Sequence, residues 1–469
     1  MKKNIVIILG LVLSVGFTSC KKYLDVAPKS SLSEDQLFES EIGFQQALSG
    51  IYAQMADRSL FGDNLSMGFV SALAQNYAVS GASAPFVETR ALNYNSSEVQ
   101  GYTNAIWNSS YAAIAGANKV IQNTEKRKSV LSSLNYALIR GEALGLRAYL
   151  HFELLRSFGP EYTAGAGLKA IPYRTTADQN ANIPATTAEA AKLALVDLQE
   201  AASLLKDKDP IQSGTSNRRI KMNYYAVKAL EARIRLYIGD KQGAFGAAQI
   251  VVASGKFPFV TTTAASAGAG SRDRLYITEL VLGLRVKDIK NWAEVSYFRF
   301  GGSANLKLTR STANFNSLYE TAAGGGTDFR YLYRIEQDGG IPFPSKFWQT
   351  YQFNTLDSNR LDQLVPLIRL SEMYYIMAET AASPADGVGY LNMVRKNRAI
   401  QELALNITQT NLDKEITKEY QKEFYAEGQL FYYYKRKKIV RMQFMNTDIP
   451  LSKYVLPIPA SELEFNPNY

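Results

Sequence analysis

YALIRGEALGLRAYLHFELLRSF, residues 136–158, places Leu138, Leu146, Leu150 and Leu154 four or eight residues apart. Residues with this spacing lie on one face of an α-helix, and that apolar face must pack against a neighbour. The dipeptide Gly159-Pro160 follows directly and ends the helix. We therefore expect a long core helix here, in a fold that is mainly α.

Helical patterns also lie on both sides of this segment. Residues 106–120 repeat the apolar spacing upstream. Downstream, Thr186 and Glu189 have the spacing of a capping box ahead of residues 190–205. These segments predict further helices that pair with their neighbours in antiparallel fashion.

Residues 223–237 and 244–253 are typical of a tetratricopeptide-like helix-turn-helix unit, with Gly239-Asp240 at the turn. A weaker candidate for the same arrangement is formed by residues 372–382 and 388–399. Such helix pairs serve as scaffolds and name no ligand by themselves. In the first unit, small residues allow close helix contact at Ala226, Ala229, Ala244 and Ala248.

The middle of the chain, residues 257–365, has a different pattern. It is rich in glycine and aromatic residues, with short strand-like pieces at 280–286 and 297–300. Loops this long inside a compact domain usually bind a ligand or are disordered. The many aromatic residues argue against disorder. A second aromatic and polar loop-like stretch covers residues 61–102.

These two stretches supply the candidate ligand-binding residues. Sugar rings stack on aromatic faces through their C–H groups, while their hydroxyls need hydrogen-bond donors and acceptors. Peptides can use the same groups, and most tyrosines and phenylalanines must simply fill the core. We lean slightly towards an oligosaccharide over an oligopeptide. The candidates are Trp292, Tyr77, Trp348, Tyr94, Asp63, Asn76 and Arg90.

The amino terminus predicts export and lipid attachment. Lys2 and Lys3 precede an apolar run at 5–15, and small residues stand just before Cys20. This pattern is typical of a lipoprotein signal that is cut at an acylated cysteine. Cys20 is the only cysteine of the chain. No later apolar run in the sequence reaches the roughly 20 residues that a membrane-spanning helix needs. We expect removal of residues 1–19 and a mature protein held at a membrane through lipid on Cys20.

Composition excludes several other classes. The chain has 469 residues, 46% of them hydrophobic, which is enough for one large or two fused cores and excludes a disordered protein. Its formal charge of +9 comes from scattered residues. The one basic cluster, residues 435–438, ends a helix-like segment, where cations stabilise the helix dipole. No nucleic-acid partner is expected.

Catalytic and cofactor patterns are also missing from the sequence. His151 is the only histidine and stands among apolar residues of the core helix, so we expect a packed core residue. Nucleophile-elbow, Walker and dinucleotide-binding motifs are absent. We expect no cofactor, no metal site and no enzyme activity. The alternative is a lipid-tethered enzyme that cleaves carbohydrate with a pair of carboxylates.

Several segments together resemble one known family. Residues 20–25, CKKYLD, are similar to the mature start of the SusD/RagB family of nutrient-uptake lipoproteins. Glu142-Ala143 and 146–149 resemble its first long core helix, and Pro366, Arg369 and Glu372 resemble its late P-x-x-R-x-x-E motif. Further similar segments follow in the family order at 392–399, 423–436 and 457–469, although Asn468 replaces a usual glycine.

The resemblance implies a function and a domain plan. It implies a non-catalytic surface lipoprotein that captures nutrient oligomers and delivers them to a SusC-like TonB-dependent barrel transporter. The family's ligand residues lie in variable loops, so none is carried over. The expected parts are a signal at 1–19, a helical region at 20–256, ligand loops at 257–365 and closing helices at 366–469.

Overall fold

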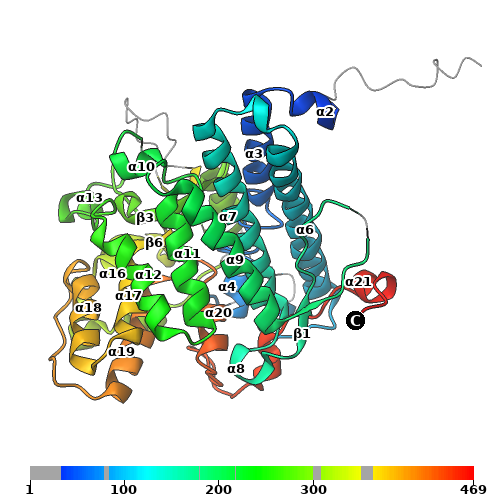
Figure 1. Ribbon diagram of the computed structural model, residues 1–469. Coiled ribbons are helices and arrows are strands. Elements are labelled where there is room, and N and C mark those ends of the chain that lie inside the picture. The colour runs from blue at the N-terminus through cyan, green and yellow to red at the C-terminus, as the bar shows by residue number, and fades with distance from the viewer. Residues whose placement is uncertain (1–32, 79–83, 179, 217, 299–307, 350–362) are drawn as a thin grey trace, which may run out of the picture.

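The computed structural model describes residues 33–78, 84–178, 180–216, 218–298, 308–349 and 363–469 (Figure 1). The predicted signal and Cys20 lie outside the described residues, as does the end of the predicted strand at 299–300. The mainly α fold is confirmed. The longest predicted helix forms as α7 (Ser133–Phe158), and Gly159 follows it in an extended conformation.

Long helices form a stack in which each helix packs against the next one along the chain. Figure 1 shows α18 and α19 at the opposite end of this stack from α6. The stacked helices are α3 (Glu41–Met55), α6 (Ser97–Lys126), α7, α9 (Thr187–Leu205), α11 (Tyr224–Tyr237), α12 (Lys241–Ala253), α17 (Leu370–Thr380), α18 (Pro384–Lys396) and α19 (Gln409–Glu423).

Helix α7 lies inside this stack, between α6 and α9. It is buried on nearly all sides because two glycines allow close approach. A Cβ atom on Gly145 would lie 2.5 Å from Met222 Cγ, and one on Gly141 would lie 2.8 Å from Leu205 Cγ. Larger residues at these positions would push neighbouring segments away from α7.

Both predicted helix pairs form, as α11 with α12 and α17 with α18. Helix α12 packs directly against α17, so the two pairs are neighbours although a long segment separates them in sequence. Ala226, Ala229, Ala244 and Ala248 are completely buried, as close helix contact requires. The predicted capping box of Thr186 and Glu189 also forms at the start of α9.

Short helices connect and cover the stack. The α-helices are α2 (Glu34–Leu37), α4 (Phe69–Leu73), α5 (Val87–Arg90), α8 (Tyr162–Gly165), α10 (Pro210–Ser213), α13 (Thr262–Ser266), α14 (Ile289–Ala293), α15 (Thr312–Leu318), α16 (Phe329–Arg334), α20 (Leu430–Arg436) and α21 (Ala460–Phe465). The 3₁₀ turns are η2 (Lys128–Val130), η3 (Ile277–Glu279), η6 (Thr321–Ala323), η7 (Gly325–Thr327) and η9 (Leu451–Tyr454).

Three antiparallel strand pairs occur among the described residues. They are β1 (Lys169–Ile171) with β2 (Ala185–Thr186), β3 (Leu280–Arg285) with β6 (Leu364–Arg369), and β4 (Ile335–Asp338) with β5 (Ile341–Pro344). The strand predicted at 280–286 is thus confirmed. The strand predicted from Tyr297 is wrong, because Tyr297 and Phe298 belong to the π-helical turn η4 (Glu294–Phe298). This turn continues α14 and buries both rings, which overrides their preference for strands.

One hydrophobic core runs through both halves of the molecule. It includes residues from Phe38 near the start of the described chain to Leu456 near its end. A second, polar interior lies around α16, α18 and α19. The hydrophobic core continues across the domain boundary predicted at 256/257. That boundary stays a prediction.

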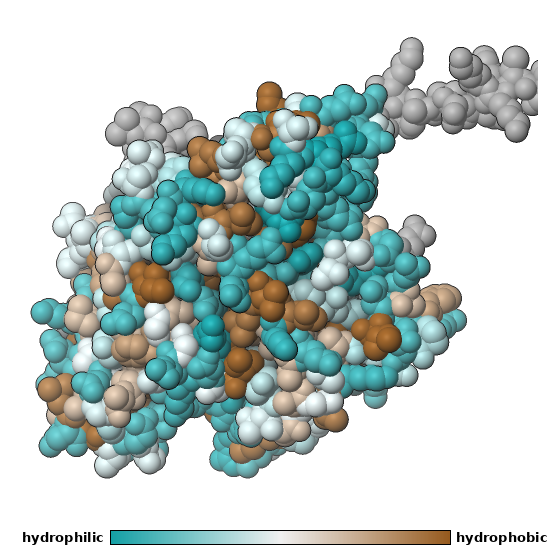
Figure 2. Space-filling view, in the orientation of Figure 1, coloured by the Kyte–Doolittle hydropathy of each residue, from teal (hydrophilic) through white to brown (hydrophobic). Residues whose placement is uncertain are grey.

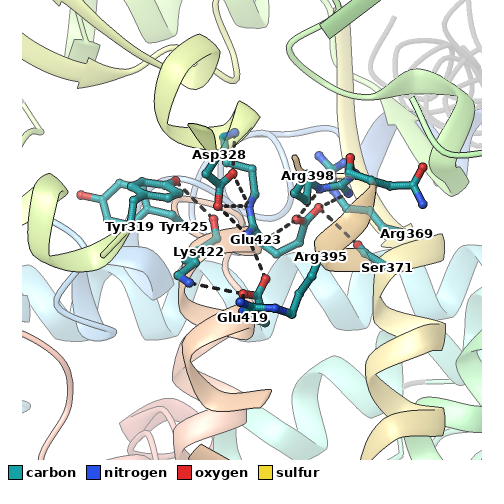
Figure 3. A network of polar contacts seen from close by, with 12 residues as sticks. Tyr319, Asp328, Arg369, Ser371, Arg395, Arg398, Glu419, Lys422, Glu423 and Tyr425 are labelled. Carbon is teal, nitrogen blue, oxygen red and sulfur yellow. Dashed lines mark hydrogen bonds and ion pairs between the residues drawn. The ribbon is translucent and has the colours of Figure 1, made fainter. Parts of the chain in front are cut away.

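The polar interior is a network of buried ion pairs (Figure 3). Arg330 is completely buried and pairs with Asp328 at 2.7 Å, Glu419 at 2.8 Å and Glu423 at 3.1 Å. Arg398 contacts the same Glu423 at 2.8 Å. Burial raises the pKa of Glu419, but Arg330, Lys422 and Arg395 together outweigh burial and lower that pKa to about 2. The shared carboxylates tie α16, α18 and α19 together.

The network continues towards the loop-rich part. Arg369, at the end of β6, pairs with Glu427 at 2.8 Å. Lys346 also pairs with Glu427, and its Nζ donates to the carbonyl oxygens of Glu423 and Tyr425 at 3.0 Å. Because Lys346 is buried and held from three sides, it fixes the chain that leads to Trp348.

One face of the molecule shows its apolar side chains in groups among hydrophilic ones (Figure 2). Figure 2 shows a mainly hydrophilic face with isolated apolar patches. Within the described part of the chain, the helices are too short or too polar to span a bilayer.

Candidate functional site

The site begins with the tightly turned segment 57–66, which follows α3. Successive backbone hydrogen bonds close it, including Leu60 N to Asp57 O at 3.0 Å and Leu65 N to Leu60 O at 2.8 Å. A Cβ atom on Gly68 would lie only 2.1 Å from Asp63 Oδ1. Glycine at this position therefore lets the segment fold over the Asp63 carboxyl group.

The indole of Trp292 lies beside this segment. Trp292 is half-buried on α14, and the guanidinium of Arg58 stands over its ring at 4.3 Å from the centroid. Tyr297, one turn later in η4, meets the same indole edge-on at 5.5 Å. Residues far apart in sequence thus form one aromatic and cationic surface. We call Arg58, Asp63, Trp292 and Tyr297 the Trp292 cluster.

Asp63 links the two halves of the Trp292 cluster. The Tyr297 hydroxyl donates to Asp63 Oδ2 at 2.9 Å, and Arg58 Nη2 lies 3.6 Å from the same oxygen. Asp63 Oδ1 is buried without a hydrogen bond among the described residues. Burial raises the pKa of Asp63 to about 7, since these two partners only partly offset the loss of water.

Further aromatic rings support the cluster from below. Phe86 lies 5.7 Å from Tyr297 and 5.3 Å from Tyr102, and Tyr102 stacks on Phe69 at 5.0 Å. This support fixes the orientation of Tyr297 and therefore of Asp63. The α6 residue Ser109 also contacts the segment, because its hydroxyl lies within hydrogen-bond distance of the Ser59 hydroxyl, at 2.8 Å.

Trp348 lies on the other side of α14 and η4. Its indole Nε1 donates to Glu294 Oε2 at 3.1 Å, and Glu294 begins η4. Arg274 stands 4.8 Å from the ring centroid, and Lys290 of α14 stands 5.7 Å from it. The α14–η4 segment therefore contains Trp292 itself and two residues, Lys290 and Glu294, that contact Trp348.

Tyr77 and Asn76 take internal positions. Tyr77 is fully buried, and its hydroxyl donates to the carbonyl oxygen of Met67. Asn76 is also buried, and its Oδ1 accepts from Ala426 N at 3.1 Å. Both residues join segment 71–78 to the turn at 425–428. They hold the frame of the site and do not face an incoming ligand in this structure.

Arg90 and Tyr94 lie apart from the Trp292 cluster. The backbone carbonyl of Arg90 accepts from Gln75 Nε2 at 2.9 Å, while burial lowers the pKa of its guanidinium. The hydroxyl of Tyr94 donates to the carbonyl oxygen of Lys453. Of the predicted candidates, the structure thus brings together Trp292 and Asp63, with Trp348 on the adjoining face.

Sequence reasoning missed Arg58 and Glu294 altogether. Arg58 stands just past the end of α3, and no motif distinguishes it from other exposed arginines. Glu294 is one acid among many. An aromatic residue near a turn was a usable signal for Trp292, but its charged partners come from elsewhere in the chain.

The expectation for His151 is confirmed. It is buried and stacks on Tyr173 with a centroid distance of 3.8 Å. Its Nδ1 lies 2.9 Å from the carbonyl oxygen of Arg147, and its Nε2 accepts from Arg174 N at 3.0 Å. Burial lowers the pKa of His151 to about 3, so the ring is neutral and structural.

Two hollows in the protein surface lie away from the Trp292 cluster. One of about 260 Å³ lies between α6, residues 172–182 and α21. Another of about 300 Å³ lies between α8, the α11–α12 turn and α20. Neither is lined by a predicted ligand-binding residue. Across the residues that the structure describes, acidic, cysteine and histidine side chains form no group that could hold a metal ion.

Comparison with known families places the chain. A family model described as "Starch-binding associating with outer membrane" matches residues 22–236, and the SusD family model matches residues 333–469. The chain belongs to the SusD/RagB family. The two matched regions lie on either side of residues 237–332, which include α14 and η4. Arg58 and Asp63 of the Trp292 cluster therefore lie in a matched region, and Trp292 and Tyr297 lie outside both.

Two curated proteins from Formosa agariphila are similar to this chain over part of their length. The SusD-like protein P38 is 25% identical over 268 residues, which are 55% of this chain and 47% of the relative. The SusD-like protein P2 is 26% identical over 150 residues, which are 32% of this chain and 29% of the relative. The chain therefore spans about half or less of the curated relatives that it matches.

Solved structures share the fold over nearly the whole chain. A SusD superfamily protein of Bacteroides thetaiotaomicron matches with a TM-score of 0.71 and 23% identity, over 92% of this chain and 98% of its own. A SusD-like carbohydrate binding protein of Bacteroides vulgatus matches with a TM-score of 0.70 and 18% identity, over 92% and 97%. At these identities the likeness concerns the fold alone.

Proposed function

We propose that this SusD/RagB protein is a non-catalytic receptor that binds nutrient oligomers, with oligosaccharides favoured over peptides. It is held at the outer membrane by lipid on Cys20 and faces the cell surface. It delivers its ligand to a SusC-like TonB-dependent transporter. Family membership and the description of the matching family model support the membrane and transport parts of this proposal.

The Trp292 cluster is the observation that carries the proposal. A half-buried indole beside a tight turn, with the Arg58 guanidinium over its ring, presents aromatic and cationic groups together. Its Nε1 is buried without a hydrogen-bond partner among the described residues, and Arg58 adds exposed donors. Apolar faces combined with hydrogen-bonding groups match the two-sided chemistry of a sugar ring.

The binding test uses the full chain in detergent and a panel of tetrasaccharides and tetrapeptides, measured by calorimetry. Trp292→Ala should weaken binding by about 1–3 kcal/mol, the usual loss for a desolvated aromatic anchor. Tyr224→Ala, which removes a half-buried aromatic residue from α11, is the matched control and should leave affinity unchanged. Equal affinity of both variants and the original protein would exclude Trp292 from the site.

The transport partner requires a separate experiment. The acylated protein, extracted from its native membrane, should co-purify with an outer-membrane barrel. Mass spectrometry should find a lipid-modified residue 20 at the amino terminus. An unmodified amino terminus, or purification without any barrel, would contradict this part of the proposal.

One observation favours the alternative of a carbohydrate-cleaving enzyme. The raised pKa of Asp63 is a property of general acids in glycoside hydrolysis. Such chemistry needs a second carboxylate that is free to act as base or nucleophile. Release of new reducing ends from the same glycan panel would support this alternative, and Asp63→Asn should then abolish the release. A receptor leaves the panel intact.

A further inference from the structure

We propose that the Trp292 cluster recognises an acidic oligosaccharide, with Arg58 binding a carboxylate or sulfate group of the ligand. This inference rests on the proposed glycan-binding function and adds the ligand class. It follows from which charged groups of the site already have partners and which do not.

Arg58 is the exposed charge of the cluster. Its side chain is 58% exposed, whereas that of Asp63 is 5% exposed. The guanidinium lies over the Trp292 ring and reaches Asp63 only at 3.6 Å. A guanidinium that lies over an indole and is 58% exposed keeps N–H groups in solvent, where a planar anion can reach them. Any ring that approaches this face of Trp292 meets the guanidinium first.

Two carboxylate oxygens next to Arg58, Asp57 Oδ1 and Asp63 Oδ2, already accept from protein donors. Asp57 accepts from Ser59 N at 2.8 Å and from Ser59 Oγ at 2.6 Å. Asp63 Oδ2 accepts from Tyr297 at 2.9 Å. A neutral sugar hydroxyl needs acceptors as well as donors, but an anionic group needs donors alone. The 58% exposed guanidinium of Arg58 is therefore the most accessible donor of the site, and it binds an anionic group more strongly than a neutral hydroxyl.

The opposite side of α14 repeats the arrangement. Lys290 stands over the Trp348 ring, and it makes no ion pair among the described residues. Glu294, the nearest acid of the same segment, accepts from Trp348 Nε1. The exposed residues Lys287 and Asp288 carry one charge of each sign and cancel. Lys290 thus leaves a second positive position beside an aromatic ring.

Guanidinium binds carboxylate and sulfate through two parallel, charge-assisted hydrogen bonds. A neutral hydroxyl in the same position offers only one acceptor atom. It therefore cannot form the two parallel hydrogen bonds, and it gains no ionic attraction. Because Arg58 is exposed, added salt should screen its contribution. The inference therefore predicts both a ligand preference and a salt dependence.

The experiment measures binding of the full chain in detergent by calorimetry. The probes are tetragalacturonate, a sulfated tetrasaccharide, the neutral cellotetraose and tetraglutamate. We expect tetragalacturonate or the sulfated sugar to bind at least ten times more tightly than cellotetraose at low salt. Raising the salt to 0.5 M should reduce that preference several-fold.

Three variants separate Arg58 from a general charge effect. Arg58→Gln should weaken binding of the acidic sugar about tenfold and binding of cellotetraose much less, so that the preference for the acidic sugar is lost. Arg58→Lys keeps the charge but loses the paired geometry, so it should recover only part of the affinity. Arg441→Gln is the matched control, because Arg441 is 59% exposed and pairs with Asp448 elsewhere on the surface. It should leave all affinities unchanged.

The outcomes distinguish this inference from the proposed function. Tight binding of cellotetraose without a preference for acidic sugars would overturn the inference and keep the glycan receptor. Binding of tetraglutamate alone would overturn both the acidic sugar and the glycan preference. Lack of binding by every probe would count against both. An equal loss with Arg441→Gln would show a non-specific charge effect and would also overturn the inference.

Discussion

The stacked helices and the polar interior around α16, α18 and α19 are held together by different interactions. In the stack, apolar faces and small residues meet between consecutive helices, and ion pairs such as Arg147–Asp197 at 2.6 Å lie among these apolar contacts. In the polar interior, fully buried carboxylates shared between arginines make the main contacts between segments. Glu419 contacts Arg330 and Arg395, and Glu423 contacts Arg330 and Arg398.

This difference determines what each region can tolerate. An apolar contact that is lost leaves a cavity, whose cost depends on how well the neighbours relax. A shared ion network that loses one arginine leaves several carboxylates buried without a counter-charge. The polar interior should therefore be the more sensitive region, and it also fixes the chain that leads to Trp348.

Arg330→Met tests this difference at its largest expected effect. Removing a partner from a buried ion pair typically costs about 3–5 kcal/mol. Three carboxylates, those of Asp328, Glu419 and Glu423, would lose their common partner. Urea unfolding followed by circular dichroism measures the loss in the free energy of unfolding.

The control for this variant is an ion pair of the same chemistry at the surface. Arg441 and Asp448 are 2.6 Å apart and more than half exposed. Arg441→Met should change the free energy of unfolding by less than about 1 kcal/mol, because solvent screens the pair. Equal effects of the two variants would contradict the sensitivity assigned to the polar interior.

Leu146→Ala tests the helical stack. Leu146 is completely buried in α7, and truncations of this kind cost about 2–5 kcal/mol through lost burial and a remaining cavity. We expect a value near the lower end, about 3 kcal/mol, that is insensitive to salt. Leu134→Ala, at an exposed position of the same helix, is the control and should be close to neutral. A similar loss at both positions would mean that α7 is not packed as described.

Asp63 predicts a pH-dependent contribution from the Trp292 cluster. Its pKa in the folded protein is about 7, above the usual 3.8, so between these values the folded state holds a proton that the unfolded state releases. The free energy of unfolding should therefore fall as pH rises from about 4 to about 7. At about 1.4 kcal/mol per unit, the full shift corresponds to about 4 kcal/mol. Movement of Arg58 towards the ionised group should reduce this to about 2 kcal/mol.

The measurement is the difference between the original protein and Asp63→Asn across this pH range. The difference is needed because His151, whose pKa is lowered to about 3 by burial, contributes the opposite slope. The variant should lose the fall with pH that Asp63 causes. Parallel pH profiles for the two proteins would show that Asp63 is ionised throughout.

Thr186→Ala is the smallest of these effects. The Thr186 hydroxyl accepts from Glu189 N at 3.2 Å, and Glu189 Oε2 accepts from Thr186 N at 2.8 Å. Loss of an N-cap costs about 1 kcal/mol. Thr175→Ala, in the exposed loop before α9, should change the melting temperature by less than the experimental error. An equally small change for Thr186→Ala would show that the cap adds no stability.

The same two regions show what could be predicted from the sequence. The stack follows from local signals, since the leucines of α7, the capping box of Thr186 and the alanines of α11 and α12 repeat along one segment each. The polar interior has no such period. Glu279 and Glu423 lie far apart in the sequence, and only the folded chain shows that both pair with Arg398. Arg330, from a third segment, reaches the same Glu423.

The candidate site lies between these two cases. Trp292 and Asp63 were predicted because aromatic and polar residues in long loops are typical of ligand sites. Tyr77 and Asn76 stand in a stretch of similar aromatic and polar composition, yet both are buried in the frame of the site. Composition alone cannot distinguish them from Trp292 and Asp63. Arg58 was missed because its partner, the Trp292 ring, lies more than 200 residues away in the sequence.

Hydrogen exchange tests the binding site most directly. The full chain is compared with and without the tightest-binding tetrasaccharide of the panel, and exchange is followed by mass spectrometry. Slower exchange in residues 57–66 and 289–298, with α9 and α18 unchanged, is the predicted result. Protection confined to residues 172–182 and α21 would place the ligand in the other hollow and contradict the assignment to the Trp292 cluster.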